Sequence, residues 1–198
     1  MRELRTMGGT EAERASAMAA ARLVERAERA GLVDVAVAEA PSPFGDLLLA
    51  ATPRGLVRLA YPGEDREATL AELARRVSLR ILEAPRRLDR VRRELEEYFG
   101  RRRERFDVPI DYSLTRGFTE RVLRVAAGIP FGTVLTYRDV AGKAGNLRAY
   151  RAAGNALGAN PIPIVVPCHR VVHAGGGLGG YTGGLDRKRF LLSLEGAM

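Results

Sequence analysis

Residues 160–172 have the sequence Asn-Pro-Ile-Pro-Ile-Val-Val-Pro-Cys-His-Arg-Val-Val, and no other segment constrains the fold as strongly. Its prolines and branched apolar residues predict a stiff, extended and buried approach to Cys168. A lone cysteine is more often a small buried side chain than a nucleophile, but His169 follows this one directly. Adjacent side chains on an extended chain diverge, so we expect one water molecule to link the two. Glu195 on the last helix would orient the imidazole and make the thiolate available near neutral pH.

A glycine-rich segment, residues 175–184, lies between the cysteine and the last helix. Three of its glycines formally satisfy a GxGxxG dinucleotide pattern, but only 18 residues follow Gly180, too few for the βαβ unit that this motif requires. The glycines are better suited to a loop that wraps closely around a flat ligand. Tyr181 and Thr182 would give this loop its specificity, and a plain turn with exposed polar residues is the alternative.

Three short helical segments precede the cysteine, at 115–127, 136–143 and 148–157. Glycine-containing turns separate them, and Thr136 with Asp139 forms a cap at the start of the second, so a helix-turn-helix arrangement is predicted.

The third of these segments, Arg-Ala-Tyr-Arg-Ala-Ala-Gly-Asn-Ala-Leu at 148–157, is rich in small residues. They would give the helix a thin face that can approach another surface closely, with Arg151 standing out from it. A tightly packed core helix is the alternative. If the helix contacts DNA, its composition favours contacts to backbone and shape over the reading of bases.

Charge is distributed unevenly along the chain. The formal net charge is +8, and residues 112–198 hold 11 Lys and Arg against 4 Asp and Glu. This excess indicates a polyanionic partner such as nucleic acid, although a solvated basic surface would have the same composition.

The N-terminal half has a mixed α+β pattern. Residues 10–30 predict an Ala-rich helix outside the core, and an antiparallel meander of three strands follows, at 33–38, 46–51 and 56–61. The remaining segments are two helices and one further strand, predicted at 67–77, 88–99 and 106–110.

The composition excludes several classes of protein. With 46% hydrophobic and 28% charged residues, the chain is globular. No apolar stretch approaches the roughly 20 residues that a bilayer span needs, and no secretory segment follows the N-terminus, so no membrane association is expected. One Cys and two His are too few for a structural zinc site, and neither a metal nor another cofactor is expected. The cysteine usage indicates a reducing, cytoplasmic location.

Four segments of the C-terminal half, in this order and spacing, resemble the O6-alkylguanine-DNA alkyltransferase family, the methylated-DNA–protein-cysteine methyltransferases. They are Ile-Pro-Phe-Gly-Thr-Val-Leu-Thr-Tyr (129–137), Arg-Ala-Tyr-Arg-Ala-Ala-Gly (148–154), Asn-Pro-Ile-Pro-Ile-Val-Val-Pro-Cys-His-Arg-Val (160–171) and Gly-Tyr-Thr-Gly-Gly-Leu…Leu-Glu-Gly (180–196). The implied α+β fold has an N-terminal helical extension (1–32), a ribonuclease H-like antiparallel sheet with helices (33–111), and a winged helix-turn-helix-like DNA-binding and alkyl-acceptor domain (112–198).

The resemblance implies a DNA repair protein that acts once. It would flip an O6-alkylguanine, or an O4-alkylthymine, out of the duplex and transfer the alkyl group to its own Cys168, with His169 and Glu195 activating the sulfur. Tyr137 would donate a hydrogen bond to the guanine ring. The residues implied in DNA binding are Arg151, which fills the space of the flipped nucleotide, its neighbours Ala149, Tyr150 and Ala152, and Asn160 and Arg170. Asn160 is also implied to tie the helix-turn-helix to the cysteine segment. The residues implied around the base are Val171, Tyr181, Thr182 and Gly183. The resemblance implies that the Cys168 and Val171 carbonyls accept from the guanine amine and that the loop of Tyr181 and Thr182 covers the base and donates to O6.

The implied partner is double-stranded DNA bearing O6-alkylguanine, bound by a protein that is a monomer in solution. Tyr150 and Thr119 depart from the family pattern, which usually has a small residue and often a Gln there. The zinc ligands of some relatives are missing. Three alternatives remain: a non-repairing alkyltransferase-like protein that only binds lesions, a helix-turn-helix regulator, and a cysteine hydrolase that uses Cys168 and His169.

Overall fold

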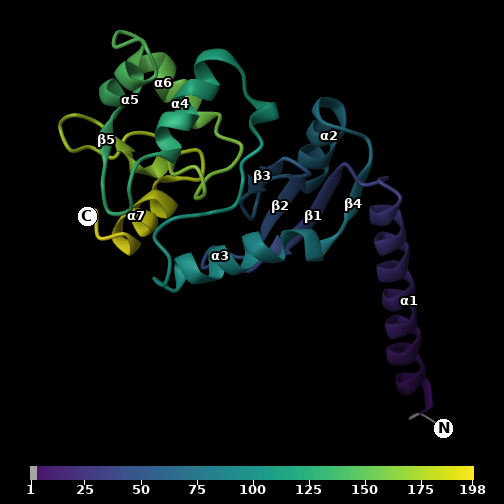
Figure 1. Ribbon diagram of the computed structural model, residues 1–198. Helices are drawn as coiled ribbons and strands as arrows, with labels where there is room; N and C mark the ends of the chain where they lie inside the picture. Colours follow the sequence, from purple (N-terminus) through teal and green to yellow (C-terminus); the bar gives the residue numbers. More distant parts are fainter. Residues whose placement is uncertain (1–3) are drawn as a thin grey trace.

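The structure is a computed structural model that describes residues 4–198, with side chains from Arg14 onward except at positions 17, 21 and 28. An N-terminal sheet flanked by helices lies beside a mainly helical C-terminal part (Figure 1). In chain order the helices and strands are α1 (Leu4–Arg29), β1 (Val35–Ala40), β2 (Leu47–Thr52), β3 (Gly55–Ala60), α2 (Arg66–Arg76), β4 (Ile81–Glu83), α3 (Asp89–Phe99), α4 (Gly117–Ala127), β5 (Leu135–Thr136), α5 (Tyr137–Lys143), α6 (Tyr150–Gly158), β6 (Val171–Val172) and α7 (Leu185–Leu194), with short 3-10 helices at Pro85–Leu88, Tyr112–Leu114 and Cys168–Arg170.

The N-terminal sheet has four strands in the order β3-β2-β1-β4. The pairs β1–β2 and β2–β3 are antiparallel, which confirms the predicted meander. The edge strand β4 was not predicted, and it pairs with β1 in parallel, so the sheet is mixed. Three residues are too few to show a period of two in the sequence.

Each face of the sheet is covered by a helix, so its strands are buried on both sides. On β1, Val35 packs in a cluster with Leu73 of α2. The next residue, Ala36, belongs to the cluster on the opposite face, which contains Leu95 of α3. This alternation follows from the pleat, in which successive side chains point to opposite faces.

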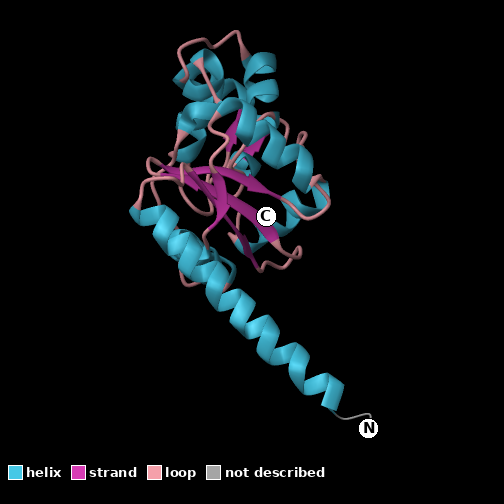
Figure 2. Cartoon of the chain, turned by 90° about the vertical axis from the view of Figure 1, so that its right-hand side faces the viewer, coloured by secondary structure: helices cyan, strands magenta, loops and turns pink. Residues whose placement is uncertain are grey.

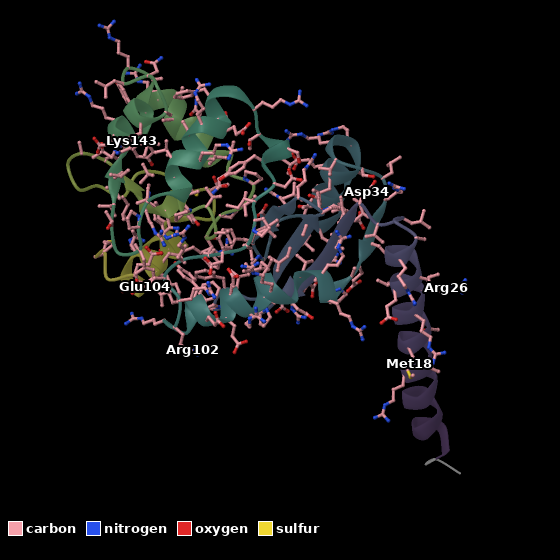
Figure 3. All side chains as sticks on the ribbon, viewed as in Figure 1. Met18, Arg26, Asp34, Arg102, Glu104 and Lys143 are labelled. Carbon is pink, nitrogen blue, oxygen red and sulfur yellow. The ribbon has the colours of Figure 1, made fainter. Side chains whose placement is uncertain are left out.

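Helix α1 extends away from the body of the protein (Figures 1 and 2). It begins at Leu4, six residues before the predicted start, and residues 1–3 of the predicted extension lie outside the described residues. Figure 3 shows Met18 and Arg26 projecting from it, and Met18 is 60% exposed. The helix is tied to the body near its end, where Glu25 forms an ion pair of 2.5 Å with Arg86. Within residues 4–198, none of the helices combines the length and apolar composition that a bilayer crossing requires.

Three helices of the C-terminal part, α4, α5 and α6, pack together. The capping box of Thr136 and Asp139 starts α5 as predicted. Helix α6 packs against α4 and α5 through Ala153, Ala156 and Leu157, all buried. The short strands β5 and β6 pair in parallel and bring the start of α5 beside the segment that follows the cysteine.

Two predicted extended segments are not strands. In 106–110 only Ile110 forms a bridge, to Leu56, because the neighbouring Pro109 has no N–H to donate to a ladder. The segment 162–166 forms tight turns, in which Val166 N donates to Ile162 O at 2.9 Å. Ile164 has a φ of 72°, a strained value for a β-branched residue. The chain therefore reaches the cysteine through compact turns rather than as an extended strand.

Candidate functional site

Cys168 begins a short 3-10 helix and lies at the edge of a cavity of about 630 Å³. The residue is only 6% exposed. Other predicted site residues line the same cavity: Tyr137, Tyr181 and Thr182, predicted to contact the base, and Tyr150 and Arg151, predicted to bind DNA. The structure thus brings together residues that are up to 45 positions apart in the sequence.

The resting thiol of Cys168 is protonated at neutral pH, so the predicted thiolate would have to form by transfer of this proton. Burial raises its pKa to about 11, although a hydrogen bond from Asn160 and the positive charge of Lys188 oppose this shift.

The Asn160 amide donates to Sγ at 3.1 Å and to the Val166 carbonyl at 2.8 Å. Asn160 is 6% exposed, so the prediction that it contacts DNA is wrong: its amide is held inside the protein. Its place between α6 and the cysteine is the one expected of a residue that ties the two together.

His169 and Glu195 are in contact, with His169 Nε2 at 2.9 Å from Glu195 Oε1 and both side chains fully buried. Burial alone would raise the pKa of Glu195, but hydrogen bonds from His169, Arg170 and Tyr98 outweigh it and lower the pKa to about 2. The carboxylate is therefore ionised, and Nε2 carries the proton that it accepts. Burial lowers the pKa of His169, so the ring is neutral at pH 7.

This arrangement leaves Nδ1 as the basic atom of the imidazole. Among the described residues Nδ1 of His169 has no hydrogen-bond partner, although it is buried. A buried acceptor without a partner is costly, and it is suited to receive a proton. The predicted link through water between Sγ and the ring stays a prediction.

Arg170 does not face DNA, and that prediction is wrong. Its side chain is 6% exposed and forms a two-point ion pair with Glu195, with both nitrogen–oxygen distances at 2.8 Å. A third hydrogen bond goes to the Ile129 carbonyl at 2.5 Å. All three nitrogens of the guanidinium therefore donate hydrogen bonds inside the protein, and two of them orient the carboxylate.

Two buried polar residues at the site were missed in the sequence. Tyr98, from α3, donates to Glu195 Oε1 at 2.6 Å. Lys188, from α7, is fully buried and donates to the Val171 carbonyl at 2.6 Å, and burial lowers its pKa to about 8. The Val171 carbonyl, predicted to accept from the guanine amine, therefore already accepts one hydrogen bond.

The exposed side of α6 borders the cavity. Tyr150 is 45% exposed, and Arg151 and Ala152 are exposed beside it. The Arg151 guanidinium lies 5.7 Å from the centre of the Tyr150 ring. The small residues of this helix do not share one thin face, because Ala153 and Ala156 point into the core. Ala149, the N-cap, is half-buried.

The glycine-rich loop covers the cavity and is fitted closely to Tyr137. Gly179 has a φ of 70°, and a Cβ there would lie 2.4 Å from the Tyr137 hydroxyl, so only glycine fits. The same hydroxyl donates to the Gly180 carbonyl at 3.4 Å. Thr182 donates its hydroxyl to the Gly158 carbonyl at the end of α6. The loop is therefore attached to the helix that borders the cavity.

No group of three or more His, Cys, Asp and Glu side chains that could hold a metal ion occurs within the described part of the chain.

Comparisons with known proteins cover both halves of the chain. The family model described as 6-O-methylguanine DNA methyltransferase, ribonuclease-like domain, matches residues 37–112. The model described as 6-O-methylguanine DNA methyltransferase, DNA binding domain, matches residues 117–197. A methylated-DNA–protein-cysteine methyltransferase of Methanosarcina barkeri is 39% identical over 155 residues, which are 78% of this chain and 92% of that protein.

Solved structures are similar over the same region. The crystal structure of the Mycobacterium tuberculosis O6-methylguanine methyltransferase matches with a TM-score of 0.70 at 36% identity, covering 82% of this chain and 93% of the other. A crystal structure of the same organism's protein in complex with DNA matches with a TM-score of 0.68 at 35% identity, over 82% and 92% of the two chains.

Proposed function

The chain belongs to the 6-O-methylguanine DNA methyltransferase family and repairs DNA as a methylated-DNA–protein-cysteine methyltransferase, and we propose that Cys168 is the residue that accepts the alkyl group. One observation carries the proposal: the only cysteine of the chain borders the cavity, next to the buried pair of His169 and Glu195. The ribonuclease-like and DNA-binding matches support the proposed division at 33–111 and 112–198, after an extension over 1–32.

The first chemical step is the removal of the thiol proton. Because burial raises the pKa of Cys168 to about 11, the proton has to leave the sulfur as the reaction proceeds. Nδ1 of His169 is the base within the site, and we infer that a water molecule carries the proton to it. Glu195, ionised and held by Tyr98 and Arg170, stabilises the imidazolium that forms.

The second step is displacement at the alkyl carbon. The sulfur forms a bond to this carbon while the bond from the carbon to guanine O6 breaks, and the electron pair leaves with guanine. Tyr137, which lines the cavity, is proposed to donate to the guanine ring, and the segment at Thr182 is proposed to donate to O6. A donor placed at such a developing charge is worth about 3 kcal/mol of the activation barrier.

The base reaches this cavity only after it leaves the duplex. The chain binds DNA, and we propose that the exposed side of α6 enters the minor groove, where Arg151 fills the space of the flipped nucleotide. Extrusion costs a few kcal/mol, and less where alkylation has already weakened the pairing. The ring of Tyr150 would add apolar contact beside Arg151, whereas Ala149 and Ala152 allow close approach.

The proposed product is a thioether, which water does not cleave, and the chain has no second thiol to regenerate the first. Each molecule would therefore act once, as a monomer on double-stranded DNA that bears O6-alkylguanine, with O4-alkylthymine as a second substrate. The lone cysteine, kept reduced, is compatible with the proposed cytoplasmic location.

Mass spectrometry after incubation with duplex DNA containing O6-methylguanine tests the proposal. We expect one added methyl group per chain, on the peptide that contains Cys168. Cys168→Ala should add none while it binds the same duplex with unchanged affinity. A methyl group found on another residue, or repeated turnover by one molecule, would refute the assignment.

A further inference from the structure

Tyr61 lies in the ribonuclease-like part of the chain, immediately after β3, yet it contacts the wall of the cavity. Its hydroxyl is 2.6 Å from the hydroxyl of Tyr181, and the two rings meet edge to face with their centres 6.3 Å apart. Tyr61 is 4% exposed, so this contact is inside the protein. Tyr181 in turn lines the cavity beside Cys168.

The contact is reinforced by a cation from α7. The Arg187 guanidinium lies 4.5 Å from the centre of the Tyr61 ring. It donates to the Gly183 carbonyl at 3.1 Å and to the Pro62 carbonyl at 3.0 Å. Arg187 therefore fastens the loop that carries Tyr181 to the turn that carries Tyr61.

The space between the two tyrosines is filled. A Cβ on Gly183 would lie 2.7 Å from both the Tyr181 ring and the Tyr61 ring, so the rings close around the bare backbone of this residue. The Tyr61 hydroxyl has Tyr181 as its only hydrogen-bond partner within the described part of the chain. Loss of this hydroxyl would thus act on Tyr181 directly.

From these contacts we propose that Tyr61 is a positioning residue for alkyl transfer. It is contributed by the ribonuclease-like domain, and it fixes the Tyr181 ring, against which the extruded base is aligned. This inference rests on the proposed role of Cys168 as the acceptor. Burial raises the pKa of Tyr61 far above the physiological range, so its hydroxyl acts as a neutral hydrogen-bonding group. The ribonuclease-like domain thereby enters the geometry of a site whose chemical groups come mainly from the DNA-binding domain.

Tyr61→Phe tests the proposal in single-turnover reactions with free O6-benzylguanine and with a duplex containing O6-methylguanine. Because each molecule reacts once, the final amount of alkylated protein measures the active fraction and the rate constant measures the alignment of the base. We expect one alkyl group per chain, as in the unmodified protein, and a rate constant lower by about three- to tenfold with both substrates, the effect of one hydrogen bond. DNA affinity should not change.

Tyr112→Phe is the matched control. The Tyr112 ring packs 4.2 Å from the Arg124 guanidinium, and its hydroxyl has no hydrogen-bond partner among the described residues. This variant should react at the rate of the unmodified protein. The double variant Tyr61→Phe/Tyr181→Phe should be no slower than Tyr181→Phe alone, because both single changes remove the same hydrogen bond.

Three results would overturn the inference: an unchanged rate constant in Tyr61→Phe, a reduced active fraction with an unchanged rate constant, or multiplicative effects in the double variant. The failure of the proposed function has a different signature, since the unmodified protein would then carry no alkyl group on Cys168.

Discussion

Replacing Glu195 by Gln removes the charge at the centre of the buried network. The two carboxylate oxygens accept hydrogen bonds from Tyr98 and His169 and two from Arg170. An amide of the same shape keeps one acceptor oxygen and presents N–H groups in place of the other. The Arg170 cation is then left buried without its counter-charge, which typically costs 3–5 kcal/mol.

The pH dependence of this loss follows from the pKa of Glu195. It is lowered from 4.5 to about 2 in the folded protein, so the folded state binds this proton more weakly than the unfolded chain. The stabilisation is therefore complete above pH 4.5 and disappears as the pH falls toward 2. With these two values the linkage relation gives a loss of about 2 kcal/mol between pH 7 and pH 3.

Urea unfolding at pH 7, 5, 4 and 3 measures this loss. The difference in unfolding free energy between the unmodified protein and Glu195→Gln should shrink by about 2 kcal/mol from pH 7 to pH 3. Asp186→Asn is the control, because Asp186 lies in the helix that Glu195 caps and its side chain is fully exposed, so that its ion pair with Arg189 contributes little to stability and its difference should change far less than that of Glu195→Gln. If the difference for Glu195→Gln stays the same at all four pH values, the carboxylate does not carry the stabilising charge.

Three further predictions concern the base, the proton and the network. Arg151→Ala should slow the repair of duplex DNA at least tenfold, since Arg151 lies at the exposed edge of the cavity. Its rate constant with free O6-benzylguanine should stay within about twofold of that of the unmodified protein. Equal slowing in both assays would contradict the proposed role of Arg151. The rate constant should be nearly flat between pH 7 and pH 9, because the Cys168 thiol, with a pKa of about 11, is protonated throughout and His169 is neutral throughout. In His169→Asn the rate constant should instead rise about tenfold per pH unit, because it would follow the fraction of Cys168 present as thiolate. A tenfold rise per pH unit in the unmodified protein would contradict an internal base. Tyr98→Phe should lower the unfolding free energy by about 1.5–3 kcal/mol, as for a hydrogen bond to a charged group, while mass spectrometry still finds one methyl group per chain; an unchanged unfolding free energy would show that the Tyr98–Glu195 contact contributes nothing.

The fold followed from the sequence where the local signals were strong. The periodic apolar residues of α3 and α4 placed these helices within two residues of their observed ends, and the Thr136 cap placed the start of α5. The signals failed at short or proline-containing segments. β4 has three residues and forms only because β1 offers it an edge, and 162–166 folds into turns although its composition favours a strand.

The site was less accessible to sequence reasoning, because several of its contacts cross between the two halves of the chain. Tyr98 continues the buried face of α3 that includes Val91 and Leu95, and a tyrosine on such a face needs a partner for its hydroxyl. Lys188 likewise lies on the buried face of α7 with Leu191 and Leu192. Both were detectable as polar residues on apolar faces, but their partners could not be inferred, since nothing local relates α3 to Glu195.

The raised pKa of Cys168 is consistent with the proposed chemistry. Oxidation of a cysteine requires thiolate character and exposure, and a protonated thiol that is 6% exposed has neither. In the proposed mechanism the thiol gives up its proton to His169 immediately before the sulfur attacks the alkyl carbon, so the charge passes on to guanine rather than resting on the sulfur. The arrival of the base, and not the resting ionisation of the thiol, then determines when the sulfur reacts. A protein whose cysteine can accept only one alkyl group benefits when the sulfur becomes reactive only with the base in place. A cysteine that was a thiolate in the resting protein would be consumed by oxidants before any damaged base was bound.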